Sequence, residues 1–279
     1  MDWEDPRKAL ARHGLQPKRQ FSQNFLVSRE AVERIAIAAT SEERPVLEFG
    51  PGLGTLTRAL LERAPKVTVV EPDPDMRRVL TEDFQDSRRE ILDGDATTFD
   101  IAAWANQESS RITVTGNLPY SVTGAILRNL MTHRDALGHA VIMVQKEVRD
   151  RLLAPPGTKE YGALTVFTAA DFGVHSVTKV SRGSFHPVPK VDSAVVRLVP
   201  HERPLVRHPR AFTILVRAAF TARRKMLRKA LRSAIDEGPF LDGLLDAAEI
   251  EGTRRGETLT VEDFDRLATL WVTSEAPQR

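Results

Sequence analysis

A four-residue segment, Asn117-Leu118-Pro119-Tyr120, places two hydrogen-bond acceptors and an aromatic ring directly after an apolar run. The Asn117 side-chain oxygen and the Leu118 carbonyl can both accept from an exocyclic amine, while Pro119 fixes its own φ and holds the preceding residue extended. Tyr120 can stack on the ring that carries the amine. The segment therefore predicts a pocket for the amino group of a flat base. Because Asn and Pro are also common turn residues after a strand, an ordinary turn is the alternative.

A glycine-rich loop farther upstream predicts a cofactor site. The run Val46–Phe49 reads as a buried strand, and a helix is expected to begin at Thr55. Glycines let the backbone approach a ligand closely, and the first turn of the next helix offers unpaired N–H groups. Dinucleotide loops have the spacing G-x-G-x-x-G, but here the third glycine comes one residue earlier. The pattern E-x-G-x-G-x-G suits S-adenosylmethionine better than NAD, because S-adenosylmethionine has no pyrophosphate.

Two acidic residues follow later strands at positions that suit an adenosine. The apolar run Val67–Val70 ends at Glu71, roughly 20 residues past the first glycine, where a carboxylate can accept from both ribose hydroxyls. Asp95 follows a third short segment and is expected to bond the adenine amine. Each acid alone could equally end a strand or cap a helix, but their order along the chain favours one binding site.

Taken together, these segments resemble the rRNA adenine dimethyltransferase family. The likeness runs from about Lys18 to Leu231, and the later blocks are similar to the small-subunit (KsgA-type) class. The resemblance implies a substrate of two adjacent adenines in the 3'-terminal hairpin loop of 16S rRNA, each methylated twice, with a role in small-subunit biogenesis. The further blocks that carry it are Gln23–Leu26, Gln145–Val148, Tyr161-Gly162, Phe185–Ser193 and Arg223-Arg224-Lys225.

A target base must leave its stack to reach such a site, and aromatic faces can return the energy of unstacking. Tyr120 is the candidate for one face. Phe185, between turn-forming Gly183 and Pro187, is the candidate for the other, with a core aromatic in a Pro-rich loop as the alternative. The expected catalytic residues are Asn117, Leu118, Pro119, Tyr120 and Phe185.

The N-terminal arm is expected to serve both ligands. Asn24 and Leu26 would close over the methionine end of the cofactor, and Lys18 and Arg19 would lie nearer the RNA. The alternative is an arm that simply packs its aromatic residues on the sheet. The expected cofactor-binding residues are Asn24, Leu26, Gly50, Gly52, Gly54, Glu71, Asp95 and Asn117.

Charge is unevenly distributed along the 279 residues. The net charge is only +2, too small to indicate a nucleic-acid partner by itself. Between His201 and Arg232, however, ten basic residues stand against the single acid Glu202, and the chain turns acidic from Asp236. Phosphate binding by a basic cluster is expected here, with a solvated helix face as the alternative. The expected RNA-binding residues are Lys18, Arg19, Arg223, Arg224 and Lys225.

Composition excludes several classes of site. Without cysteine there can be no disulfide, thiolate metal site or cysteine nucleophile, and the seven histidines show no paired metal spacing. No apolar run reaches about 18 residues, and no signal peptide is apparent. We therefore expect a cytoplasmic protein that uses no metal and no membrane. The resemblance implies that it acts as a monomer and that its partner is 16S rRNA in the immature small ribosomal subunit.

Strand and helix patterns alternate up to Pro200 and then become helical, which predicts an α/β domain with a parallel sheet followed by a smaller all-helical domain. The resemblance implies that this is the Rossmann-like sheet of a class I S-adenosylmethionine-dependent methyltransferase. The expected domains are 1–200, for S-adenosylmethionine binding and catalysis with the N-terminal arm, and 201–279, for RNA binding. Expected helices in the first domain are Arg29–Ala39, Thr55–Arg63, Pro74–Phe84 and Thr123–Thr132. Expected strands there also include Ala140–Val144, Val174–Val180 and Ser193–Leu198. Expected helices in the second are Phe212–Ile235, Phe240–Ala248 and Val261–Thr269.

Two rival functions remain open at this point. One is an erythromycin-resistance-type methylase of large-subunit rRNA, which shares the cofactor loop and the Asn-containing segment. The block Pro189–Ser193 and the cluster Arg223-Arg224-Lys225 favour the small-subunit class. The other rival is a ribosome-assembly or RNA-binding factor that keeps the fold but does not depend on turnover.

Overall fold

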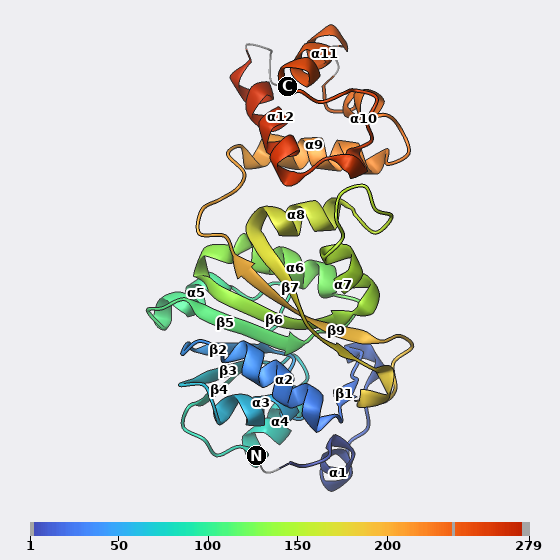
Figure 1. Cartoon of the computed structure of the whole chain (residues 1–279). Helices are drawn as coiled ribbons and strands as arrows, with labels where there is room; N and C mark the ends of the chain where they lie inside the picture. Colours follow the sequence, from blue (N-terminus) through green and yellow to red (C-terminus); the bar gives the residue numbers. More distant parts are fainter. Residues whose placement is uncertain (1–2, 236–237, 275–279) are drawn as a thin grey trace. The chain divides into compact units, whose positions relative to one another are not determined.

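The computed structural model describes residues 3–235 and 238–274 and divides the chain into two compact units (Figure 1). The first takes in the chain up to Arg149 together with Val174–Pro200. The second takes in Asp150–Gly173 and the chain from His201 onward. The expected boundary after residue 200 therefore coincides with a real change of unit. The continuous domain expected over 1–200 is wrong for Asp150–Gly173, because apolar residues of this segment pack into the helical core.

The first unit is built on a seven-stranded sheet with the strand order β4-β3-β2-β5-β6-β9-β7. Strands β4 to β6 run parallel, and β9 is antiparallel to β6, so the expected α/β class is confirmed. Every residue of β2 and β3 is buried, as expected for parallel strands covered on both faces. The bounds are β2 (Val46–Phe49), β3 (Val67–Val70), β4 (Arg89–Leu92), β5 (Ile112–Asn117), β6 (Leu137–Gln145), β7 (Phe172–Val180) and β9 (Ser193–Pro200).

Helices of the first unit begin where the sequence supplies caps. Ser28 accepts a hydrogen bond from the Ala31 amide at the start of α2, and Asp73 caps α4 with Pro74 in its first turn. The expected ranges of α2 and α6 are confirmed, whereas α3 and α4 end one or two residues early. The bounds are α2 (Arg29–Ala39), α3 (Thr55–Leu61), α4 (Pro74–Asp83), α5 (Ile101–Gln107), α6 (Thr123–Thr132), α7 (Lys146–Leu152), η2 (Arg134–Ala136) and η3 (Arg182–Ser184).

The N-terminal arm is anchored on the first unit by charge and by packing. It contains α1 (Pro6–Arg12), η1 (Arg19–Phe21) and β1 (Phe25–Leu26), and β1 pairs antiparallel with β8 (Phe185–His186). The Arg12 guanidinium contacts the Asp83 carboxylate at 2.7 Å. Phe25 is buried in a cluster that includes residues of α1 and α4. The alternative of an arm that packs its aromatic residues on the sheet is therefore not met by Phe25, which packs against helices α1 and α4 and the glycine-loop residue Leu53.

The second unit has a helical core of its own. Its helices are α8 (Ala163–Asp171), α9 (Pro209–Thr221), α10 (Leu227–Leu231), α11 (Gly238–Ala247), α12 (Val261–Thr273) and η4 (Gly256–Thr258). Among them, Phe212 and Phe264 meet edge to face, with ring centroids 6.2 Å apart. Asp236 and Glu237, the first acids after the basic segment, lie outside the described residues. No helix in the described ranges is long and apolar enough to span a membrane.

The single helix expected over Phe212–Ile235 is wrong, because the chain breaks between α9 and α10. After the break, the Leu227 amide donates to the Arg254 carbonyl at 2.6 Å, and the Arg228 amide donates to the Gly252 carbonyl at 3.0 Å. These tertiary bonds replace the bonds that a continuous helix would make. The basic cluster Arg223-Arg224-Lys225 therefore lies in the turn between two helices rather than on a helix face.

Candidate functional site

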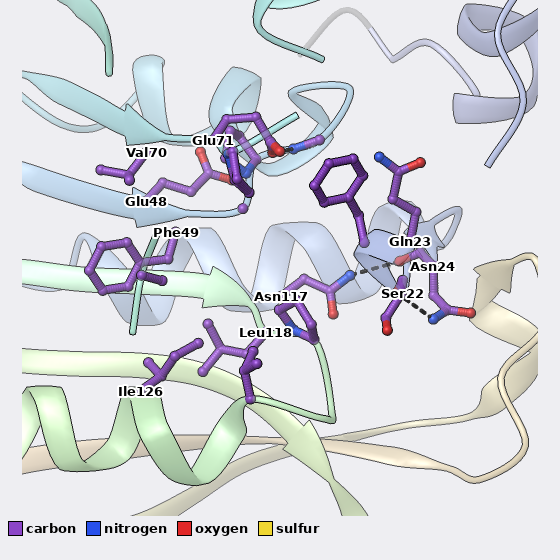
Figure 2. Close-up of a pocket in the computed structure, with 18 of the residues that line it drawn as sticks. Ser22, Gln23, Asn24, Glu48, Phe49, Val70, Glu71, Asn117, Leu118 and Ile126 are labelled. Carbon is purple, nitrogen blue, oxygen red and sulfur yellow. Dashed lines mark hydrogen bonds between the residues drawn. The ribbon is translucent and has the colours of Figure 1, made fainter. Parts of the chain in front are cut away.

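A cavity of about 300 Å³ lies in the first unit where β2, β3 and β5 end (Figure 2). The carboxyl ends of parallel strands are the usual place for ligands in open α/β sheets. Besides Ile35 of α2, four parts of the chain line it, namely the arm, the end of β2 with the glycine loop, the chain after β3 and β4, and the segment after β5. They contribute residues 20–26, 48–52 with 55–56, 70–72 with 95–96, and 117–122 with 126.

The three loop glycines have different surroundings although all have positive φ. Gly50, at φ +66°, lines the cavity, and a Cβ built on it would meet no atom within 4 Å. A Cβ on Gly52 would lie 2.9 Å from the Phe25 ring, and one on Gly54 would lie 2.4 Å from the Phe84 ring. Gly54 does not line the cavity. Its expected role in cofactor binding is thus replaced by close packing where α3 begins.

Glu71 and Asp95 both line the cavity, as expected. The two oxygens of Glu71 accept from the Gly52 amide at 3.0 Å and from the Asp73 amide at 2.9 Å, which fixes the carboxylate. Burial raises the pKa of Glu71. Asp95 is exposed, and its Oδ1 accepts from the Thr97 amide at 2.8 Å. Asp95 therefore both shapes a turn and borders the cavity.

Glu48 is a buried carboxyl that the list of expected site residues omits. It lines the cavity from the end of β2, is only 1% exposed, and accepts from the Thr57 hydroxyl at 2.6 Å. Burial raises the pKa of Glu48 to about 8. The side chain is thus mostly uncharged at neutral pH. In the sequence, the one acidic residue of the otherwise apolar run Val46–Phe49 could have indicated this position.

Asn117 and Leu118 both line the cavity, and Asn117 is held by the arm. Its amide nitrogen donates to the Asn24 backbone carbonyl at 2.9 Å, a bond drawn in Figure 2. Among the described residues, the Asn117 side-chain oxygen has no hydrogen-bond partner. The amide is therefore oriented with its nitrogen toward Asn24 and its oxygen available as an acceptor. The Asn24 side chain itself donates to the Ser22 carbonyl at 3.0 Å.

Pro119 and Tyr120 also line the cavity, and Leu26 borders it from the arm. The Tyr120 ring is half-buried, and its hydroxyl lies 2.6 Å from the Ser193 hydroxyl. The stacking role expected for Phe185 is wrong in this structure, because the ring is only 2% exposed and does not line the cavity. Phe185 packs in the sheet core beside Leu26, its partner in the β1–β8 pair, so the core alternative holds.

The basic residues expected to bind RNA differ in how they are engaged. Lys18 contacts Asp73 at 2.7 Å and Asp75 at 2.6 Å and does not line the cavity, whereas Arg19 is exposed. In the second unit, the Arg223 guanidinium donates to Glu257 at 2.6 Å and to the Lys159 carbonyl at 2.5 Å. Arg223 therefore ties parts of its own unit together.

The other two members of the basic cluster, Arg224 and Lys225, are exposed.

Of the side chains that the structure describes, no three His, Asp or Glu residues are grouped so that they could hold a metal ion.

Comparison with known proteins confirms the resemblance drawn from the sequence. A family model described as "Ribosomal RNA adenine dimethylase" matches residues 14–267. A "Ribosomal RNA small subunit methyltransferase A" of Myxococcus xanthus is 41% identical over 267 residues, which are 94% of this chain and 93% of that protein. The protein of the same name from Laribacter hongkongensis is 42% identical over 253 residues, or 89% of this chain and 93% of that protein.

Two solved structures resemble the chain over most of its length. A dimethyladenosine transferase from Plasmodium falciparum has a TM-score of 0.74 and 27% identity, with 87% of this chain and 95% of that chain covered. The 23S rRNA methyltransferase ErmE has a TM-score of 0.66 and 30% identity, with 88% and 99% covered. The first is named a dimethyladenosine transferase and the second a methyltransferase of 23S rRNA.

Proposed function

Because the chain belongs to the ribosomal RNA adenine dimethylase family, we propose that it methylates the exocyclic amines of two adjacent adenines in the 3'-terminal hairpin loop of 16S rRNA, twice each. The observation that carries the proposal is the cavity in which an oriented Asn117 amide stands beside the glycine loop. The names of the relatives at 41% and 42% identity support the small subunit as the substrate. We place this activity in a cytoplasmic, monomeric chain that acts on immature small subunits.

The cavity suits S-adenosylmethionine as the methyl donor. Its volume of about 300 Å³ is at the lower end of the usual range for small-molecule sites. Gly50 leaves open the space that a Cβ would fill, and each oxygen of Glu71 keeps a lone pair for a ribose hydroxyl. Asp95 would accept from the adenine amine. When bound, the cofactor supplies an electrophilic methyl group on a positively charged sulfur.

The chain's own contribution is to hold the target amine. Its lone pair is delocalised into the adenine ring, so the amine is a poor nucleophile until that pair is localised on nitrogen. The Asn117 oxygen and the Leu118 carbonyl would accept the two amine hydrogens and favour a pyramidal nitrogen. These bonds strengthen as positive charge grows on nitrogen in the transition state. The methylated nitrogen is acidic and can lose its extra proton to water, so the mechanism requires no general base.

Tyr120 would supply a stacking face for the extruded adenine, and exposed cations would contact the RNA backbone. A base–aromatic stack is worth about 1–3 kcal/mol, which offsets part of the cost of unstacking. Arg19, Arg224 and Lys225 are the exposed candidates for phosphate contacts. Lys18 and Arg223 would contribute less directly, because both are engaged in ion pairs within the chain.

A large-subunit methylase is the second candidate, favoured by the 30% identity to ErmE. Incorporation of tritiated methyl groups into purified subunits from an unmethylated strain separates the two. We expect label in the small subunit, in dimethyladenosine. Label confined to the large subunit would establish the second candidate, and no label in either would favour an assembly factor that acts without turnover.

Replacing Asn117 with Ala tests the assigned chemistry. We expect a loss of methylation rate of about 100-fold, typical for removal of one group that stabilises a transition state, while cofactor affinity falls much less. Rate is measured by methyl transfer and affinity by calorimetric titration. Asn106→Ala, on the exposed side of α5, is the matched control and should behave as wild type. Lost cofactor binding with a normal residual rate would contradict the assignment.

A further inference from the structure

Tyr120 is anchored by a residue that does not itself line the cavity. The Tyr120 hydroxyl and the Ser193 hydroxyl lie 2.6 Å apart, and either atom can be the donor. Ser193 is 1% exposed and is absent from the cavity wall, whereas Tyr120 is half-buried and forms part of that wall. The pair thus connects a buried strand residue to an aromatic ring at the ligand space.

Ser193 is fixed on both sides by backbone hydrogen bonds. It begins β9 and pairs with Gln145 at the end of β6. The preceding residue, Asp192, accepts from the Lys146 amide at 2.9 Å through its carbonyl and from the Arg182 amide at 2.9 Å through its carboxylate. The backbone of Ser193 therefore has a defined position, from which its hydroxyl reaches the Tyr120 hydroxyl.

Tyr120, by contrast, lies in the short turn between β5 and α6. The turn is closed by the Val122 amide, which donates to the Pro119 carbonyl at 3.2 Å. Within the described residues, the bond to Ser193 is the one hydrogen bond of the Tyr120 side chain. Because a phenol bonds near the plane of its ring, a fixed partner at the hydroxyl restricts both the tilt and the rotation of the ring.

We propose that Ser193 is a positioning residue, whose hydroxyl holds the Tyr120 ring as a preformed stacking face for the adenine. This inference rests on the proposed function, since it assigns the ring a base to stack on. Without the Ser193 hydroxyl, the phenol would lose its partner and the ring would sample other rotamers. The entropy cost of ordering the ring would then oppose binding of the RNA. The affinity for RNA should therefore fall, whereas the affinity for the cofactor should not.

The test is a double-mutant cycle of Ser193→Ala, Tyr120→Phe and the double variant, assayed for methyl transfer to small subunits. Both single variants remove the same hydroxyl bond, so we expect each to lower kcat/KM for RNA by about 3- to 10-fold and the double variant to be no worse than either. The loss should appear mainly in KM for RNA. Ser193→Thr, which restores a hydroxyl on a strand, should recover most of the activity.

Two measurements separate positioning from a loss of structure. Cofactor affinity by calorimetry and the melting temperature should stay close to wild type in Ser193→Ala. Ser181→Ala removes an exposed serine hydroxyl from a nearby loop and is the matched control. Fully multiplicative effects in the double variant, or equal losses of cofactor and RNA affinity, would overturn the inference.

The outcome for the wild-type chain distinguishes the two proposals. If wild type methylates the small subunit and Ser193→Ala retains full kcat/KM, the positioning role is overturned and the proposed function stands. If wild type methylates neither subunit, the proposed function fails, and the role of Ser193 fails with it.

Discussion

Two side chains at the cavity owe their chemical state to neighbours rather than to their own type. An amide can act as donor or acceptor, and the Asn24 carbonyl selects the acceptor for Asn117 by occupying its nitrogen. A carboxyl is normally charged at neutral pH, yet burial keeps Glu48 largely protonated. The bond to Asn24 restricts the orientation of the Asn117 amide, and protonation of Glu48 lowers the negative charge of the cavity wall.

The raised pKa of Glu48 predicts a specific dependence of stability on pH. The pKa is about 8 in the folded chain and returns toward 4.5 on unfolding. Between these values the folded chain keeps a proton that the unfolded chain releases. The stabilisation is therefore complete below pH of about 4.5 and is lost as the pH rises toward about 8.

Glu48→Gln should weaken this dependence, because it keeps an uncharged acceptor for the Thr57 hydroxyl and cannot titrate. We expect its melting temperature, followed by circular dichroism without ligand, to fall less than that of wild type between about pH 5 and about pH 8. Some slope should remain, since burial also raises the pKa of Glu71. Glu43→Gln, at an exposed position, should keep the wild-type slope. Parallel curves for wild type and Glu48→Gln would contradict the prediction.

At the scale of elements, the loop between β2 and α3 divides its glycines between ligand space and packing. Gly50 faces open space in the cavity, whereas Gly54 is pressed against Phe84, which follows α4. Similar positions in a sequence motif therefore have different physical reasons for excluding a side chain. The turn between α9 and α10 also combines a structural residue with exposed ones. Arg223 forms a hydrogen bond with Glu257 of the same unit, whereas Arg224 and Lys225 are exposed.

Alanine at the two glycines should separate binding from stability. Both positions have positive φ, which costs about 1–2 kcal/mol for alanine. Gly54→Ala adds a clash with the Phe84 ring, so we expect a total loss of about 2–4 kcal/mol in the free energy of unfolding. Gly50→Ala should lose only the backbone part but bind S-adenosylmethionine more weakly. Denaturant unfolding and calorimetric titration would measure both, and similar profiles for the two variants would refute the division.

The basic turn should likewise separate into structural and RNA-binding residues. Arg224→Ala combined with Lys225→Ala should weaken RNA binding and reduce the slope of log K against log salt by about 1–2, without lowering the melting temperature. Arg223→Ala should instead lower the free energy of unfolding by about 1–2 kcal/mol, because it breaks bonds to Glu257 and two carbonyls. If the double variant keeps the wild-type affinity at low and high salt, the turn is only a solvated surface.

At the scale of the whole molecule, the chain enters the helical unit twice. Asp150–Gly173 contributes α8 to that core before the chain returns to complete the sheet with β7 and β9. Tyr161 and Val166 both belong to this segment. The Tyr161 hydroxyl donates to the Leu259 carbonyl at 2.7 Å, and Val166 is fully buried in the helical core. The helical unit is therefore assembled from two separate stretches of chain.

A fragment of residues 1–200 should consequently associate, although the sequence pattern predicts a domain boundary after residue 200. Removal of the chain after Pro200 would expose the apolar face of α8, so we expect the fragment to bind a hydrophobic dye and to associate. Val166→Asn together with Phe167→Ser in the same fragment should reduce dye binding. A monomeric 1–200 fragment that binds no dye would show that the apolar face of α8 is buried in some other way.

The sequence was sufficient for the features that depend on local order and not for those made by distant contacts. The alternation of strands and helices, the glycine loop and Asn117 could be predicted, because each is a short pattern of residue types. The bond between Asn117 and the Asn24 carbonyl could not, since the two residues are 93 positions apart and a carbonyl has no sequence signature. The break after α9 was missed because neither Gly nor Pro marks it.

If Asn117 grips the target amine as proposed, its bond to the Asn24 carbonyl makes the arm part of the reaction's specificity for an amine. A free carboxamide can turn over by half a rotation and exchange its nitrogen for its oxygen. In the turned state, two N–H groups would meet the hydrogens of the base, and the site would repel the very group it must grip. Displacement of the arm by proteolysis or by a bulky fusion would thus leave Asn117 at the end of β5 but free its carboxamide to turn.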